Sequence, residues 1–182
     1  MSELSYRLDA GDRLQAVSGN WEASARQGGA TTLAGDAVLG RSLWEFVRDA
    51  TLRDIYGRLF VIVRSRGEPL SFDYRCDTPT ERRLMRMTLT PLGNANIEIA
   101  NAQVWADPRP PVRQQNVFRG SATVRCCSLC NHFEIEGQWV DVCDAVSAGM
   151  LGRVERSIRV AFAVCAPCRA RVESMLGRLE AG

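Results

Sequence analysis

The sequence predicts an α+β protein in which a five-stranded antiparallel sheet, with helices on one face, precedes a small cysteine-rich domain. The first observation is the order of expected elements, which is two strands, then helices, then three strands. The second is the composition, because 182 residues that are 46% hydrophobic can bury at least one core. The third is that six of the seven cysteines follow a proline-rich stretch at 107–115.

The first half opens with a predicted hairpin, in which strands at 4–8 and 14–17 flank a turn-forming quartet, Asp-Ala-Gly-Asp, at 9–12. Short helices are expected at 21–26 and 41–48. A longer amphipathic helix follows, because apolar residues recur at the spacing of one helical face before Gly67 ends the pattern. These residues are Leu52, Ile55, Tyr56, Leu59 and Val63.

Three further strands are predicted at 70–77, 83–91 and 96–105, where apolar and polar residues alternate and each strand is expected to be half buried. Their apolar faces carry Leu70, Phe72, Tyr74 and Cys76, then Met85, Met87 and Leu89, then Ile97 and Ile99. A charge-rich group beside the turn at 78–81 is interpreted either as cross-strand ion pairs on a solvated face or as a docking surface. It comprises Arg75, Asp77, Arg82, Arg83 and Arg86.

Three stretches of this half resemble a PAS domain, namely AVSGNW at 16–21, VLGRSLW at 38–44 and FDYRCD at 72–77. The resemblance extends over most of residues 4–106. It implies a sensor or protein-interaction module, often dimeric, with a pocket between the sheet and the helices. By itself it implies no chemistry.

Seven large side chains are candidates to line such a ligand pocket, although core packing is the default for residues of these types. They are Trp21, Trp44, Phe60, Phe72, Tyr74, Met85 and Met87. The ligand is unknown. Haem with an axial histidine is disfavoured, because the single histidine, His132, follows the proline-rich stretch. Cys76 is interpreted as a small buried hydrophobe rather than as a thiolate ligand.

The chain is expected to divide at the proline-rich stretch, which interrupts the periodic pattern. We predict a PAS-like sensor or interaction domain at 1–106, a proline-rich linker at 107–119 and a zinc-binding domain at 120–182. In the last range we expect a hairpin or strand at 134–142, a helix at 144–151, a strand at 158–164 and a helix at 169–179.

Two C-x-x-C pairs, Cys127/Cys130 and Cys165/Cys168, form the strongest functional motif. Each turn lets two thiolates converge on one ion, and two such turns complete the tetrahedral four-cysteine shell that zinc accepts. A pair in a hairpin followed by a pair at a helix N-terminus is a treble-clef-like arrangement. We predict one structural Zn²⁺ per chain, because four protein thiolates leave no open coordination position.

Alternatives to zinc remain open at this stage, namely a C-x-x-C redox pair, an iron–sulfur or other metal centre, and cysteines without a ligand. Cys126 could compete with its neighbour Cys127 as a ligand. Cys143 is expected to be a packed thiol, and a role for His132 at the surface or behind the ligands is favoured.

The C-terminal half is also similar to a cysteine-rich segment found beside PAS, kinase or receiver modules in bacterial signalling proteins. The residues concerned are CSLC at 127–130, GQWV at 137–140 and CAPC at 165–168. This chain differs from that segment in two features. Proline stands one place later in the second pair, and VAFAV at 160–164 replaces a histidine-bearing stretch.

No catalytic set can be named, because the chain has one histidine and no P-loop, glycine-rich nucleotide motif or kinase motif. We therefore expect a non-enzymatic bacterial protein of the cytoplasm that acts in signal transduction through a protein partner and as a possible homodimer. A nucleic-acid-binding regulator with zinc is the first alternative, and a thiol-based redox sensor is the second. Residues 107–182 hold ten arginines and eight acidic residues, so a zinc-loaded domain with four thiolates is near neutral and nucleic acid is disfavoured.

Overall fold

The computed structural model describes residues 3–23, 35–47, 49–112, 114–116, 124–150 and 158–181. The chain forms two compact units. The first comprises Met1–Asp73, Met85–Val104 and Met175–Gly182, and the second comprises Tyr74–Leu84 and Trp105–Ser174. Within the described residues, no helix is both long and apolar enough to cross a membrane.

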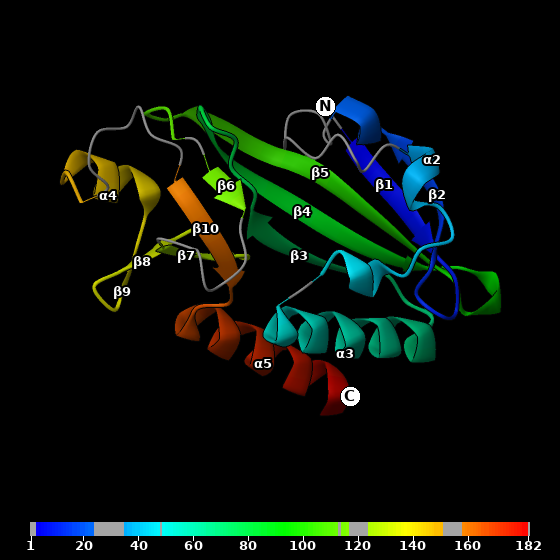
Figure 1. The fold of residues 1–182 in the computed structure, drawn as a ribbon. Helices are drawn as coiled ribbons and strands as arrows, with labels where there is room; N and C mark the ends of the chain where they lie inside the picture. Colours follow the sequence, from blue (N-terminus) through cyan, green and yellow to red (C-terminus); the bar gives the residue numbers. More distant parts are fainter. Residues whose placement is uncertain are drawn as a thin grey trace. The chain divides into compact units, whose positions relative to one another are not determined.

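The sheet of the first unit has five strands in the order β2-β1-β5-β4-β3 (Figure 1). The strands are β1 (Glu3–Leu8), β2 (Leu14–Gly19), β3 (Leu70–Arg75), β4 (Glu81–Pro91) and β5 (Ile97–Pro108). Strand β1 pairs antiparallel with both of its neighbours, so that Tyr6 lies opposite Val17 of β2 on one side and Ile99 of β5 on the other. The predicted α+β class and its five-stranded sheet are confirmed.

Helix α3 (Ala50–Arg66) forms where the apolar periodicity predicts it. It begins because the Asp49 side chain accepts a hydrogen bond from the Leu52 N–H, which satisfies a donor that has no partner inside the helix. It ends because Gly67 adopts a left-handed conformation with φ 68°, which costs glycine little.

Arg64, near the end of α3, ties this helix to two turns of the sheet. Its Nη2 donates to the Asp9 carbonyl and to Asp12 Oδ1, both at 2.8 Å, and its Nε donates to the Ala95 carbonyl at 2.8 Å. The apolar face of α3 is buried with the apolar faces of the strands. The largest buried side chains here are Leu8, Leu14, Ile55, Leu59, Phe60, Leu89, Ile97 and Ile99.

Two smaller helices of the first unit differ in extent from the prediction. The helix expected at 41–48 is wrong in length, because only the 3-10 helix η2 (Leu43–Glu45) forms in the described part of this range. Asp49 must adopt an extended conformation to cap α3, so the chain cannot remain helical up to it. A four-residue helix, α2 (Gly35–Val38), was not predicted. Residues 24–26 of the helix expected at 21–26 lie outside the described residues.

The second unit contains a mixed sheet in the order β6-β10-β7-β8-β9. Its elements are β6 (Gln114–Asn116), β7 (Val124–Cys127), β8 (Phe133–Ile135), β9 (Gln138–Val140), α4 (Val142–Ser147), β10 (Ile158–Ala163) and α5 (Ala166–Ala181). Strand β10 runs parallel to both β6 and β7, whereas β7, β8 and β9 form an antiparallel meander. The predicted hairpin, helix, strand and final helix of this region are confirmed, with bounds that differ by a few residues.

Strands β8 and β9 join through a tight turn at Glu136 and Gly137, whose φ values are 49° and 81°. Two successive positive φ values are typical of the turns that match the twist of a two-residue hairpin. The core beneath this sheet comprises Val112, Cys126, Phe133, Val142 and Val160. Helix α5 supplies residues to both units, and in the first unit its Glu180 accepts from Arg58 Nε and Nη2 at 2.9 Å each.

Candidate metal centre

The structure brings together the four cysteines that the C-x-x-C spacing singles out. The Sγ atoms of Cys127, Cys130, Cys165 and Cys168 all lie within 4.8 Å of one another. The Sγ atoms of Cys130 and Cys165 are 3.7 Å apart. Zinc–sulfur bonds of ~2.3 Å at tetrahedral angles place sulfurs about 3.8 Å apart, so the spacing of this pair fits a shared ion and is far too long for a disulfide.

The first pair lies in the turn between β7 and β8. The turn closes through two backbone hydrogen bonds, from the Asn131 N–H to the Cys127 carbonyl at 2.9 Å and from the Cys127 N–H to the His132 carbonyl at 2.8 Å. Asn131 has φ 59°, a left-handed conformation that asparagine tolerates better than most residues. This turn, residues 127–132, is called the first knuckle below.

The second pair lies where β10 ends and α5 begins. The Cys165 carbonyl accepts from the Arg169 N–H at 2.9 Å, and the Cys165 N–H points at Cys127 Sγ, 3.4 Å away. The Ser128 N–H donates to the Ala163 carbonyl at 2.8 Å, which fixes the first knuckle beside the second pair. The positive end of α5 therefore lies at the sulfur cluster and favours negative charge there.

Electrostatics within the cluster favour one thiolate before any cation binds. The pKa of Cys127 lies well below its ordinary value, because the Cys130 and Cys168 thiols and the Cys165 N–H donate to its sulfur. The pKa of Cys130 is raised to about 12, because its proton is held by the Cys127 sulfur. A divalent cation bound here would supply the charge that lets the remaining thiols lose their protons.

The remaining cysteines lie outside the cluster. Cys126 is fully buried and its Sγ lies 3.2 Å from Asn131 Oδ1, while burial raises the pKa of its thiol, so it acts as a packed hydrogen-bond donor and not as a ligand. Cys143 is half-buried beside Asp141. The interpretation of Cys76 as a buried hydrophobe is wrong, because Cys76 is exposed with its Sγ 3.8 Å from Arg83 Nη2.

Arg171 also contacts the cluster, and no motif in the sequence predicts this contact. Its Nη2 lies 3.9 Å from Cys168 Sγ, one helical turn away on α5. A guanidinium so close would offset part of the negative charge of the cluster when its cysteines are ionised. The i, i+3 spacing of Cys168 and Arg171 is the only sequence signal for this contact.

The seven candidates for a ligand pocket occupy different environments. Phe60, Met85 and Met87 are buried, whereas Trp21, Trp44, Phe72 and Tyr74 are half-buried. The Phe60 ring packs against two neighbours, with centroid distances of 5.8 Å to Trp44 and 6.0 Å to Tyr56. Tyr74 belongs to the second unit, and the other six belong to the first.

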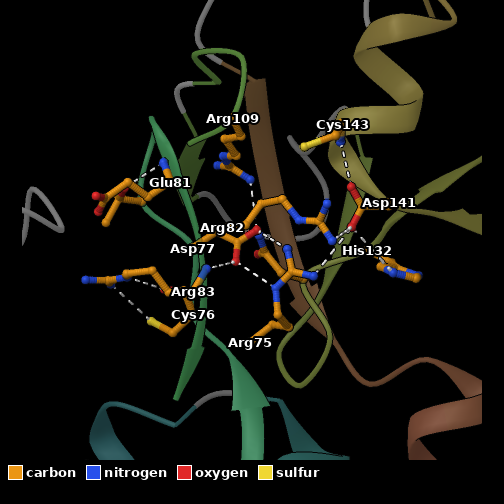
Figure 2. A network of polar contacts seen from close by, with 12 residues as sticks. Arg75, Cys76, Asp77, Glu81, Arg82, Arg83, Arg109, His132, Asp141 and Cys143 are labelled. Carbon is orange, nitrogen blue, oxygen red and sulfur yellow. Dashed lines mark hydrogen bonds and ion pairs between the residues drawn. The ribbon is translucent and has the colours of Figure 1, made fainter. Parts of the chain in front are cut away.

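The charge-rich group beside the β3–β4 turn contains both buried and exposed ion pairs. Arg75 and Asp77 form an ion pair at 2.7 Å whose side chains are 13% and 0% exposed. Arg86 instead pairs with Asp73 on the surface of the first unit, at 2.8 Å. Arg109, from the predicted linker, also reaches Asp77 Oδ2 at 3.0 Å with a side chain that is 1% exposed. Figure 2 shows Asp77 between Arg75 and Arg109.

No family model and no curated protein matches this chain. A domain of an HTR-like protein from Haloarcula marismortui is 11% identical, covers 58% of this chain and all of its own length, and has a TM-score of 0.43. The PAS domain of the quorum-sensing receptor RpfR from Cronobacter turicensis is 12% identical, covers 58% of this chain and 96% of its own length, and has a TM-score of 0.44.

A third similar structure is the photoactive yellow protein domain of the sensor histidine kinase Ppr from Rhodospirillum centenum. It is 16% identical, covers 56% of this chain and 91% of its own length, and has a TM-score of 0.42. The first unit is characterised by its own five-stranded antiparallel sheet, in the order β2-β1-β5-β4-β3.

Proposed function

We propose that this chain is a non-enzymatic signalling or regulatory protein, in which a PAS-like unit senses a signal or dimerises and a zinc-stabilised unit binds a protein partner. The observation that carries the proposal is the closed sulfur cluster of Cys127, Cys130, Cys165 and Cys168. Four protein thiolates around one ion leave no position for water or substrate, and such sites are structural rather than catalytic.

Zinc is the ion that the donor set fits best. Four thiolates in a tetrahedral arrangement select zinc or iron–sulfur chemistry, and carboxylate-loving ions such as Mg²⁺ and Ca²⁺ are disfavoured. An odd number of cysteines with two C-x-x-C pairs is typical of metal-binding chains in a reducing compartment, which supports a place in the bacterial cytoplasm. A mononuclear zinc site is favoured over a cluster, because the sulfur spacing of 3.7 Å agrees with the edge of a single tetrahedron of sulfurs around zinc.

The PAS-like unit supplies the sensing half of the proposal. Its buried Phe60 packs against Trp44 and Tyr56, and Met85 and Met87 are buried as well. These side chains provide an apolar interior suited to a small hydrophobic ligand or to a fixed core. If ligand binding in this interior favours the dimer or the monomer, the signal is transmitted as a change in the populations of the two forms.

Metal analysis of the purified protein tests the zinc proposal. We expect about one zinc and no iron per chain, with loss of the metal in Cys127→Ser and in Cys168→Ser. Cys76→Ser is the matched control, because Cys76 is exposed and outside the cluster, and it should keep its zinc. Iron in the wild-type protein, or retention of full zinc in both ligand variants, would overturn the assignment.

Sensing and partner binding need a separate experiment. Native mass spectrometry of the protein from its own host should show a small molecule bound to the chain or a mixture of monomer and dimer. Affinity capture with wild-type and Cys168→Ser baits should recover a protein partner only with the zinc-loaded bait. A single fixed oligomeric state with no ligand and no partner would contradict the signalling proposal.

A further inference from the structure

The tip of the β3–β4 hairpin, residues 74–84, is built into the unit that holds the sulfur cluster. Three backbone hydrogen bonds attach this hairpin tip. The Arg75 N–H donates to the Leu129 carbonyl at 2.8 Å, the Arg109 N–H donates to the Thr80 carbonyl at 2.9 Å, and the Val112 N–H donates to the Pro79 carbonyl at 2.8 Å. The first of these bonds ends on the first knuckle itself, between its two cysteines.

Asp77 is the centre of this attachment, and its side chain is completely buried. Arg75 donates to both of its carboxylate oxygens, from Nε at 2.9 Å and from Nη2 at 2.7 Å. Arg109 Nη1 donates to Oδ2 at 3.0 Å and the Arg83 N–H donates to Oδ1 at 3.0 Å. Figure 2 shows these donors converging on Asp77 from the hairpin tip and from Arg109.

Two routes lead from this carboxylate to the first knuckle. Arg75, held in place by Asp77, bonds to Leu129 through its own N–H. Asn131 lies near Asp77 and lowers the pKa of its carboxyl, and Asn131 Oδ1 accepts from Cys126 Sγ at 3.2 Å. Arg75 Nη1 also lies 3.5 Å from Asp141 Oδ2, so the guanidinium spans two carboxylates.

The energetic consequence follows from burial. A buried carboxylate without its partners strongly destabilises the folded state. Arg75 and Asp77 therefore keep their arrangement only while the residues around them stay in place. The first knuckle forms part of those surroundings, and an ion held by its thiolates in the proposed metal site would organise it. Binding equilibria linked in this way influence each other by the same factor in both directions.

We propose that Asp77 is a positioning residue of the metal centre, which acts through Arg75 and the Leu129 carbonyl to hold the first knuckle in its metal-binding shape. Metal affinity and attachment of the hairpin tip are therefore linked. Because β3 and β4 supply residues to both units, the same link connects the metal centre with strands of the PAS-like sheet. This inference rests on the proposed metal site and adds its regulation.

The first test compares the metal affinity of Asp77→Asn with that of Asp73→Asn. Both changes remove one negative charge from the same stretch of chain, but Asp73 pairs with Arg86 on the surface. In competition with a chelator, Zn²⁺ should bind Asp77→Asn about 10- to 100-fold more weakly than wild type, as expected for loss of a residue that supports the ligands. Equal affinities for the two variants would overturn the proposal.

The visible absorption spectrum of bound Co²⁺ distinguishes a positioning role of Asp77 from a general effect on stability. Co²⁺ bound by four thiolates absorbs strongly in the visible range, and the spectrum depends on the geometry at the ion. At saturating Co²⁺, Asp77→Asn should give altered band positions or intensities, whereas Asp73→Asn and the core variant Leu89→Ala should match the wild type. Identical spectra for all variants would refute a positioning role.

A measurement on the wild-type chain does not depend on whether any variant folds. Hydrogen exchange is followed with zinc bound and after its removal by a chelator. Amides of the hairpin tip should lose protection together with those of the first knuckle, while β1 and β2 stay protected. Unchanged protection at the hairpin tip, or equal loss in β1 and β2, would overturn the linkage. Failure of the proposed function is distinguishable, because the wild-type protein would then bind no zinc at all.

Discussion

Arg109→Met is the substitution whose effect on stability follows most directly from the structure. The Arg109 side chain is 1% exposed and lies 3.0 Å from the fully buried Asp77 carboxylate. Methionine keeps the length of the side chain but removes the charge and the donor. Breaking one side of a buried ion pair typically costs about 3–5 kcal/mol, and we expect about 3 kcal/mol here because Arg75 and the Arg83 N–H still contact Asp77.

Urea unfolding of the zinc-loaded protein measures this change as a shift of the midpoint at constant slope. Arg86→Met is the matched control, because Arg86 makes an even shorter pair with Asp73, at 2.8 Å, but on the surface. The control should leave the midpoint almost unchanged, since exposed pairs contribute little. The reasoning is refuted if both variants shift the midpoint equally, or if Arg109→Met matches the wild type.

Four further changes have defined outcomes. Phe60→Ala should lose about 3–5 kcal/mol of unfolding free energy in urea titrations, whereas Val61→Ala, at a position that is 65% exposed, should lose little. Asp49→Ala should lose about 1 kcal/mol in the same assay, because it removes the cap of α3. Hydrogen bonds from Arg75 and the Arg83 N–H outweigh burial and lower the pKa of Asp77, so ionised Asp77 stabilises the fold above pH ~4. The stability difference between wild type and Asp77→Asn should therefore shrink as acid titration proceeds below that pH. Arg75→Lys should weaken zinc binding in chelator competition, whereas Arg86→Lys should not.

Local patterns in the sequence were sufficient for most of the helices and strands and for the four clustered cysteines. Helix α3 could be predicted because its apolar stripe, its cap and its terminal glycine all lie close together, from Asp49 to Gly67. The sulfur cluster could be predicted because C-x-x-C spacing already places two sulfur atoms close together. Only the approach of the two pairs to each other depends on the tertiary fold. Both patterns involve residues that are close in the sequence, so the local backbone geometry alone determines which side chains meet.

The buried network around Asp77 could not be predicted in the same way. Asp77, Arg109, Asn131 and Asp141 come from four separate segments, and each is polar and belongs to a type that is usually exposed. Strand alternation places Arg75 on the face opposite Phe72 and Tyr74, which suggests a solvated face until another part of the fold covers it. Composition around Arg109 predicts a linker because prolines flank it, and nothing local shows that its guanidinium is buried.

The structure gives a physical reason for arginine rather than lysine at position 75. All 23 residues of the lysine and arginine class are arginine, a bias for which composition alone gives no functional reason. Arg75 uses its planar fork on two carboxylates at once, with Nε and Nη2 on Asp77 and Nη1 3.5 Å from Asp141. A lysine ammonium is a point charge without this fork, so it could neutralise either carboxylate but could not hold both in a fixed geometry. The network that supports the first knuckle therefore depends on the shape of guanidinium as well as on its charge.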